Sequence, residues 1–134
     1  RLTMEKYLYF RTEATDADDN ATGDSACFPA SSLMGMQPTN DSELTLYFRS
    51  ITRQHPGGSA DSSANLANHD TVVLNLTTAN THLECMKAIS RAVTFPSVTG
   101  LIIIANDDSD NPVYLLDSGI SGCGTITVAP AYTN

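Results

Sequence analysis

The sequence lacks tryptophan altogether and is poor in basic side chains, with 7 lysines and arginines against 15 aspartates and glutamates. Its formal net charge is therefore −8 at neutral pH. The few basic residues are spread along the chain and form no patch, so a phosphate backbone would be repelled rather than attracted. We therefore expect no nucleic-acid partner.

Cysteines and long apolar runs are also scarce. Cys27, Cys85 and Cys123 are odd in number and follow no CxxC spacing, which argues against a disulfide framework and a zinc site. We expect three small buried side chains. The longest apolar run, residues 101–105, is far too short to span a membrane, so we expect a soluble protein without a membrane partner.

Hydrophobic periodicity is what the sequence does contain. Residues 70–78 place Val72, Leu74 and Leu76 on one side of an extended chain, which predicts a half-buried strand. Residues 101–105 are continuously apolar and β-branched in the middle, which predicts a buried strand.

A helix is predicted between these two strands and is expected to pack against them. Thr81 and Glu84 have the spacing of a capping box at its start, and Phe95-Pro96 ends it. The apolar residues that recur at helical spacing are Cys85, Met86, Ile89, Ala92 and Val93.

Further strands are predicted on either side of this unit. The tetrapeptide Leu-Tyr-Phe-Arg occurs at positions 8–11 and 46–49, and the shared alternation would let these two strands lie side by side in one sheet. Between them, a third strand is predicted, followed by a turn that includes Pro38. The expected strands are residues 6–12, 28–36, 42–51, 113–116 and 125–129.

After the helix, the turn at residues 106–112 predicts a hairpin between its two flanking strands. Residues 119–124 are glycine-rich and are expected to break the chain before the last strand, whose Ile126 and Val128 would face inward. The chain is thus predicted to be a single α+β domain over residues 1–134. It would have a mainly antiparallel sheet, one substantial α-helix and the order β-β-β-β-α-β-β-β.

Two polar segments, residues 13–24 and 55–69, are longer than ordinary connections and have little to bury. Ordering them costs conformational entropy, so we expect a partner to order them and an interface that combines them with a sheet face or edge. Tyr7, Tyr9, Tyr47 and Tyr114 would line the non-core face of the sheet. There they either meet a partner chain or cover the sheet as ordinary packing.

The acidic segment begins like a calcium-binding EF-hand loop, with oxygen ligands at Asp16, Asp18 and Asn20. The pattern then fails, because Ala21 stands where the sharp turn needs glycine and Cys27 stands where a bidentate glutamate is needed. We expect a solvated loop, with weak opportunistic calcium binding as the alternative.

No catalytic, cofactor-binding or metal-ligating residue is predicted. Residues 119–123, Gly-Ile-Ser-Gly-Cys, are similar to a nucleophile elbow, but Cys123 replaces the last glycine and a strand follows where a helix is required. His55, His69 and His82 share no spacing that would pair them on a metal.

An overall pattern, rather than any single motif, extends over most of the chain. It consists of residues 5–12, 16–32, 36–39, 44–48, 70–76, 80–82 and 120–128. With this pattern the sequence resembles a class of small structural proteins from tailed phages of marine and cyanobacterial habitats. The resemblance implies a non-enzymatic virion component of the kind that decorates or cements a capsid. Such proteins would begin at Met4, so the Arg1-Leu2-Thr3 start departs from them.

Three functions follow as hypotheses. The first is a virion subunit that binds copies of itself and a major capsid or other virion protein. The second is a tail, tube or filament subunit that assembles through unpaired sheet edges. The third is a small enzyme or ligand-binding domain, which would need polar groups that converge in one pocket.

Overall fold

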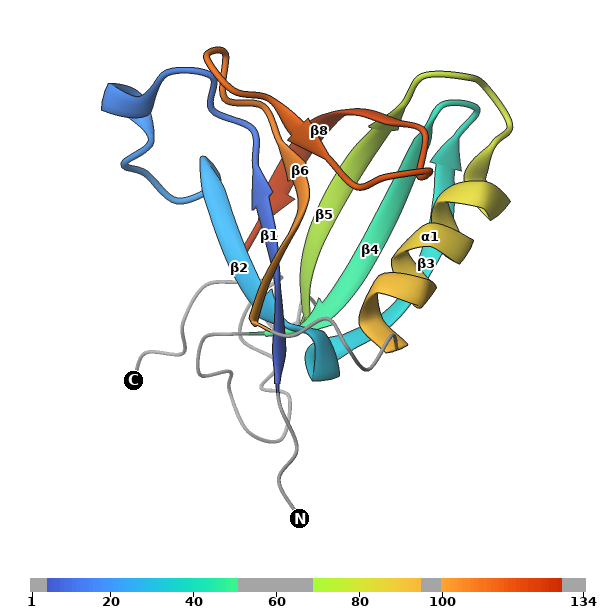
Figure 1. The fold of residues 1–134 in the computed structure, drawn as a ribbon. Coiled ribbons are helices and arrows are strands. Elements are labelled where there is room, and N and C mark those ends of the chain that lie inside the picture. The colour runs from blue at the N-terminus through green and yellow to red at the C-terminus, as the bar shows by residue number, and fades with distance from the viewer. Residues whose placement is uncertain (1–4, 51–68, 95–99, 129–134) are drawn as a thin grey trace, which may run out of the picture.

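The computed structural model describes residues 5–50, 69–94 and 100–128. In this part of the chain, eight strands, one α-helix and two 3-10 helices follow one another (Figure 1). Their bounds are β1 Lys6–Arg11, η1 Asp16–Asp18, β2 Ser25–Pro29, η2 Ala30–Ser32, β3 Leu33–Asn40, β4 Glu43–Arg49, β5 His69–Leu76, α1 His82–Thr94, β6 Gly100–Asn106, β7 Val113–Tyr114 and β8 Ile120–Thr127.

The strands form two sheets that face each other across one core (Figure 1). Sheet A has the order β2-β1-β6-β7, and sheet B has the order β3-β4-β5-β8. All neighbouring strands are antiparallel except β1 and β6, which run parallel. Both sheets and α1 contribute to one buried hydrophobic cluster. The predicted class, a mainly antiparallel α+β domain with one helix, is confirmed, and so is the β6–β7 hairpin.

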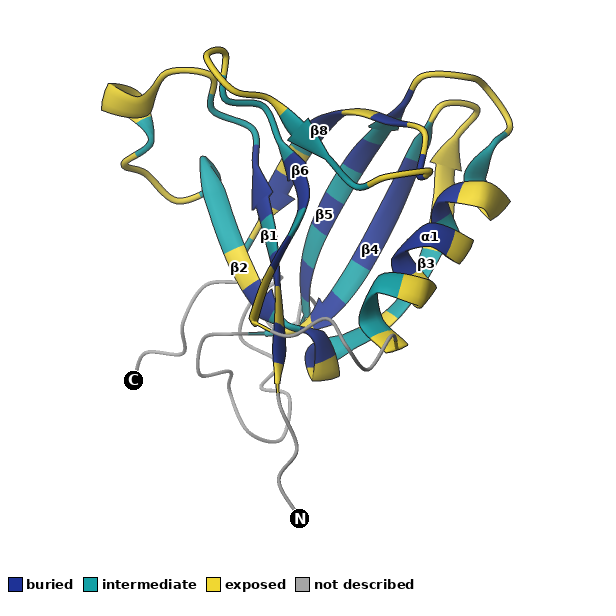
Figure 2. Cartoon of the chain, viewed as in Figure 1, coloured by how far each residue is buried: buried dark blue, intermediate teal, exposed yellow. Residues whose placement is uncertain are grey.

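Strand alternation determines the centre of the core (Figure 2). Leu8 and Phe10 of β1 and Leu46 and Phe48 of β4 are all fully buried. The Phe10 and Phe48 rings meet edge-on at 5.8 Å, and the Phe28 ring stacks on Phe48 at 4.3 Å. The two Leu-Tyr-Phe-Arg strands therefore lie in opposite sheets, and the expectation that they are neighbours in one sheet is wrong. Their shared alternation suits contact across a core as well as pairing within a sheet.

The predicted strand over residues 28–36 is two strands in different sheets. β2 ends at Pro29, η2 turns the chain, and β3 begins at Leu33 in sheet B. Proline has a fixed φ and no N–H, and the Ser32 hydroxyl donates a 2.7 Å hydrogen bond to the Pro29 carbonyl. Apolar residues stand on both sides of this turn, so the pattern alone did not reveal it.

Two predicted interruptions are strand instead. Residues 119–124 contain the first half of β8, where a Cβ on Gly124 would lie 3.1 Å from the carbonyl oxygen of Val73. This glycine permits the close approach of β5 rather than a turn. Pro38 lies within β3, an edge strand on which its missing N–H is tolerated, and the turn falls at Asp41 and Ser42.

Helix α1 lies beside β3 and shares the core with β6 (Figure 1). Its buried residues are Cys85, Ala88 and Ile89, with Met86, Ala92 and Val93 partly buried against the core. The Thr81 hydroxyl donates to the Thr78 carbonyl at 2.7 Å, a different bond from the predicted pairing with Glu84. The predicted stop at residues 95–96 lies outside the described residues. Within those residues, no helix has the length and apolar character needed to cross a membrane.

Both ends of α1 are tied to the sheets. The Lys6 ammonium group on β1 donates to two carbonyl oxygens in the last turn of α1, at 3.1 and 2.9 Å. A cation there complements the negative end of the helix dipole. At the other end, His82 Nε2 lies 2.7 and 3.0 Å from the carbonyl oxygens of Asn40 and Glu43. Because both partners are acceptors, Nε2 carries the proton of these bonds.

Candidate interaction surface

The side of sheet A that faces away from the core carries two rows of uncharged side chains across three strands. Residues that are paired on adjacent strands point to the same side of a sheet, so the two rows form one continuous surface. We call this surface the outer face. It consists of Pro29, Tyr7 and Leu101 in one row and Cys27, Tyr9 and Ile103 in the next, running from β2 through β1 to β6.

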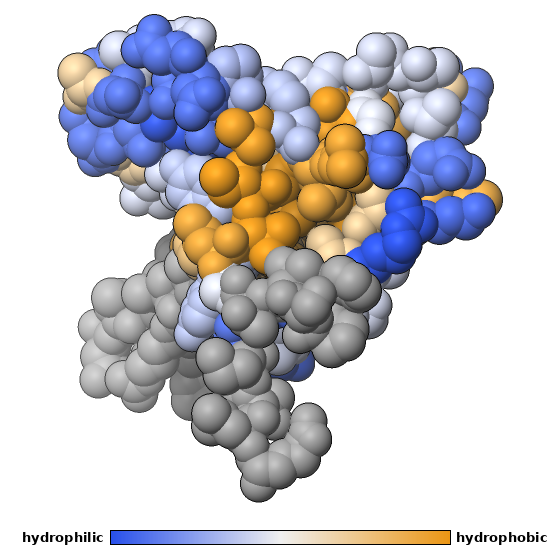
Figure 3. Space-filling view, viewed as in Figure 1, coloured by the Kyte–Doolittle hydropathy of each residue, from blue (hydrophilic) through white to orange (hydrophobic). Residues whose placement is uncertain are grey.

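Large apolar side chains on the outer face are open to solvent. Leu101 is 57% exposed and Tyr7 is 42% exposed. Figure 3 shows hydrophobic surface gathered over β6, with hydrophilic surface on both sides of it. Monomeric proteins rarely leave a large contiguous apolar patch uncovered, so the outer face is a candidate docking surface.

Only two of the four tyrosines expected on a non-core face share this surface. Tyr47 belongs to sheet B, where its ring centroid lies 5.4 Å from that of His69. The Tyr114 hydroxyl donates to a carboxylate oxygen of Asp107 at 2.5 Å. Tyr7 and Tyr9 are therefore the pair for which the partner-contact interpretation remains.

Sequence reasoning missed the members of the outer face that lie on β6 and β2. Residues 101–105 were expected to be buried throughout, but β6 alternates, with Ile102 and Ile104 in the core and Leu101 outside. A continuous apolar run hides this alternation. Cys27 was expected to be buried but is exposed, whereas Cys85 and Cys123 are buried, and all three are free thiols.

Arg11 is the next outward position of β1 and closes one end of the outer face. Its side chain is almost fully buried, with Nη2 2.9 Å from Asp16, Nη1 3.7 Å from Asp108 and Nε 3.9 Å from Asp19. Nε also donates to the Glu13 carbonyl at 2.6 Å. Burial lowers the pKa of Arg11, but the hydrogen bond with Asp16 and the charges of all three carboxylates outweigh it and raise that pKa above its ordinary value.

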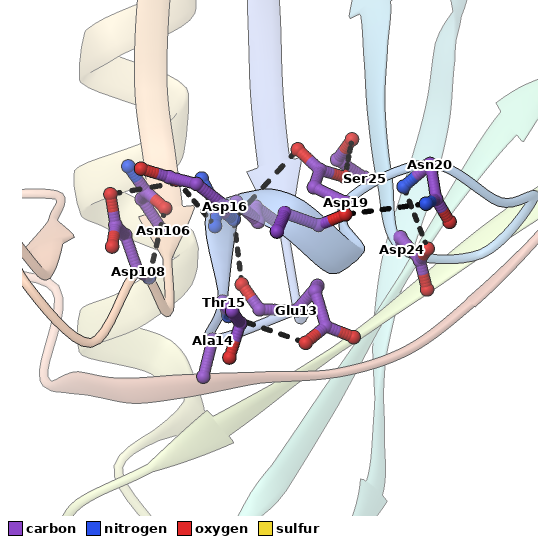
Figure 4. Close-up of polar contacts among 12 residues, drawn as sticks. Glu13, Ala14, Thr15, Asp16, Asp19, Asn20, Asp24, Ser25, Asn106 and Asp108 are labelled. Atoms are coloured by element: carbon purple, nitrogen blue, oxygen red, sulfur yellow. Dashed lines mark hydrogen bonds and ion pairs between the residues drawn. The ribbon is translucent and has the colours of Figure 1, made fainter.

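The acidic segment at residues 13–24 folds around this charge (Figure 4). The Asp24 carboxylate accepts hydrogen bonds from the backbone N–H groups of Asn20 and Ala21, at 3.1 and 2.8 Å. Asp19 accepts a 2.8 Å bond from the Ser25 hydroxyl. Arg11, Ser25 and backbone donors thus satisfy the carboxylates of Asp16, Asp19 and Asp24 within the chain. That a partner further orders this segment stays a prediction. The other polar segment, residues 55–69, lies outside the described residues except for His69.

Acidic side chains are concentrated beside the outer face. Residues 13–24 and 107–110, which we call the acidic border, hold eight of the 15 acidic residues, and Arg11 is the basic residue they enclose. The hydrogen bond from the Ser109 N–H to the Ala14 carbonyl, at 2.9 Å, joins the two segments.

Within the acidic border, Asp16, Asp108 and Asp110 each offer a carboxylate oxygen, and these atoms lie within 4.8 Å of one another. They are the residues that could hold a cation. Calcium prefers about six to eight oxygen ligands, and Arg11 already supplies positive charge to two of the three carboxylates. The EF-hand-like pattern did not anticipate this group, since Asp18 and Asn20 are not in it.

The segment similar to a nucleophile elbow is part of a strand. Ser121, at its centre, lies in β8, and its hydroxyl donates to the Asn75 carbonyl at 3.4 Å. Burial, with the Asp107 charge added, raises the pKa of Cys123 to about 12, and burial raises that of Cys85 to about 11. Both thiols therefore stay protonated at neutral pH, which suppresses the nucleophilic thiolate. His69 and His82 lie on β5 and α1, and His55 is outside the described residues.

In comparisons with known proteins, no family model, no curated protein and no solved structure matches the chain.

Proposed function

We propose that this chain is a non-enzymatic structural subunit of a tailed-phage virion, a capsid decoration protein that works by binding its neighbours in the particle. The observation that carries the proposal is the outer face, where Tyr7 and Leu101 lie exposed on paired strands. Aromatic and aliphatic side chains in such a setting form the centres of protein interfaces. The sequence resemblance supplies the kind of particle.

The construction of the outer face favours binding over catalysis. Three hydrogen-bonded strands hold the backbone of the outer face in place, so little backbone conformational entropy is lost when a partner covers it. The buried thiols of Cys85 and Cys123, by contrast, are kept in their unreactive form.

Cryo-electron microscopy of purified particles, with the chain identified in them by mass spectrometry, tests this function. We expect many copies at symmetric positions on the shell, with the outer face covered. Leu101→Ser should reduce incorporation, whereas the control Leu83→Ser, at a similarly exposed leucine on α1, should not. A dispersed monomer with measurable enzymatic turnover would contradict the proposal.

One observation favours the tail, tube or filament alternative. β7 pairs with Ala105 and Asn106 alone, so in the described part of the chain no strand covers the same edge of β6 from Gly100 to Ile103. A neighbouring chain could add a strand at such an edge. Copies stacked in a helix, rather than closed around shell symmetry axes, would identify this alternative.

A further inference from the structure

We infer that the outer face binds a partner surface with an apolar centre and a basic border, rather than a second copy of this chain. This inference rests on the proposed assembly function and identifies the chemistry of the partner. It follows from how charge is placed around the outer face.

The acidic border adjoins the outer face on the same side of sheet A. Tyr7, Tyr9 and Arg11 are successive outward positions of β1, and Arg11 lies in ion pairs with Asp16 and Asp108. The uncharged rows therefore give way to carboxylates within one step along the strand. Figure 3 shows the corresponding hydrophilic surface next to the hydrophobic surface over β6.

The acidic border keeps a large negative excess. It holds eight acidic residues, and Arg11 is the basic side chain paired with three of them. Asp18 and Asp110 are exposed, and neither lies within ion-pair distance of a basic side chain in the described ranges. These carboxylates are therefore available to a partner.

The same negative charge disfavours a second copy of this chain as the partner of the outer face. Two identical chains each carry a net charge of −8, so their approach is opposed by repulsion that salt only screens. A basic surface would instead be attracted to the border, while its apolar centre covers Tyr7 and Leu101. Interfaces commonly combine an apolar centre with a polar rim in this way.

Three labelled peptides of about 12 residues, long enough to span a strand, serve as probes of the full chain. The first alternates valine with lysine, the second alternates valine with glutamate, and the third alternates serine with lysine. Fluorescence anisotropy gives their dissociation constants at about 20 and about 200 mM NaCl, where charge screening differs strongly. We expect the valine–lysine peptide to bind at least about tenfold more tightly than either other peptide, and more weakly at the higher salt concentration.

Matched variants separate the two parts of the surface. Leu101→Ser should weaken binding of the valine–lysine peptide at both salt concentrations, whereas Leu83→Ser should not. The double variant Asp18→Asn, Asp110→Asn should weaken binding about tenfold at low salt and much less at high salt. It removes two carboxylates that attract the lysines of the peptide, and salt screens this attraction. The control double variant Asp41→Asn, Glu84→Gln removes equal charge away from the border and should leave binding unchanged.

The inference is wrong if the valine–glutamate peptide binds as well as the valine–lysine peptide, if no peptide binds, or if Leu101→Ser behaves like Leu83→Ser. It is also wrong if sedimentation equilibrium shows a dimer that Leu101→Ser abolishes and Leu83→Ser does not. In that case a second copy occupies the outer face, and the assembly function stands. The assembly function fails separately, if purified particles do not contain the chain.

Discussion

The tetrapeptide Leu-Tyr-Phe-Arg occurs in β1 and again in β4, and the two copies compare one sequence in two surroundings. The leucine and the phenylalanine are fully buried in both. The arginines differ, because Arg11 is buried within the acidic border whereas Arg49 is exposed and donates to the Ser31 carbonyl at 2.8 Å. The burial of inward-facing side chains thus follows from strand alternation. The burial of outward-facing side chains depends on which other segments the fold places over them.

The strongest test of the inner positions is to remove each phenylalanine ring. Phe10→Ala and Phe48→Ala should each lower the free energy of unfolding by about 3–5 kcal/mol, because each leaves a cavity in the same cluster. The rings touch, so the double variant should depart from additivity by about 0.5–1.5 kcal/mol. Urea denaturation measures these values, and a much smaller loss at one site would show that the copies are not equivalent inside.

The two arginines test the outer positions. Arg11→Met should lower the free energy of unfolding clearly, because Asp16, Asp19 and Asp108 lose their shared cation and repel one another. Arg49→Met should change it by no more than about 0.5 kcal/mol, as is usual for surface substitutions. Thermal unfolding at low and high salt checks this difference, and salt should reduce the loss in Arg11→Met. Equal losses of unfolding free energy in Arg11→Met and Arg49→Met would show that the two arginines contribute alike to stability.

Alkaline pH probes the buried side of β8, which faces the same core. The pKa of Cys123 is raised from its ordinary 9.0 to about 12, so folding favours the protonated thiol. The resulting stabilisation is complete below pH 9.0 and is lost as the pH rises toward about 12. Cys123→Ala should therefore lose less stability than the unmodified chain over that range, as measured by urea denaturation at each pH. If the free energy of unfolding falls equally with pH in Cys123→Ala and in the unmodified chain, this thiol is not the group responsible.

The tyrosine variants should have a small effect on stability and should differ from each other in binding. Tyr9→Ser and Tyr47→Ser should each cost about 1 kcal/mol or less, since neither side chain is fully buried. Only Tyr9→Ser should weaken assembly, because Tyr9 lies on the outer face and Tyr47 packs against His69. Incorporation of both variants into particles, measured beside their unfolding curves, checks this expectation.

Local patterns were sufficient for much of the fold. The strand containing Val72, Leu74 and Leu76 and the helix containing Cys85 and Ile89 were predictable, because periodicity depends only on neighbouring residues. Which strands pair was not predictable from the shared tetrapeptide, since identical alternation serves both sheets.

The candidate site was predictable only in part. Tyr7 and Tyr9 were identified by alternation, but a run of apolar residues concealed the exposure of Leu101. Residues 13–24 were recognised as acidic and residues 106–112 only as a turn. The two segments meet around Arg11, whose position depends on the register of β1 beside β6. Such long-range register has no local signal in the sequence.

The parallel pairing of β1 with β6 has a consequence for how the chain folds. β1 lies between β2 and β6 in sheet A, and Lys6 is paired with Gly100. Half of the hydrogen-bonding capacity of β1 therefore waits until residues 100–106 are present, and contacts so distant in sequence form slowly. During synthesis, the edge of β1 that later pairs with β6 would remain unprotected, a state that favours aggregation. We therefore expect this chain to aggregate during folding unless chaperones are present or its concentration is low, and to refold slowly once released from denaturant.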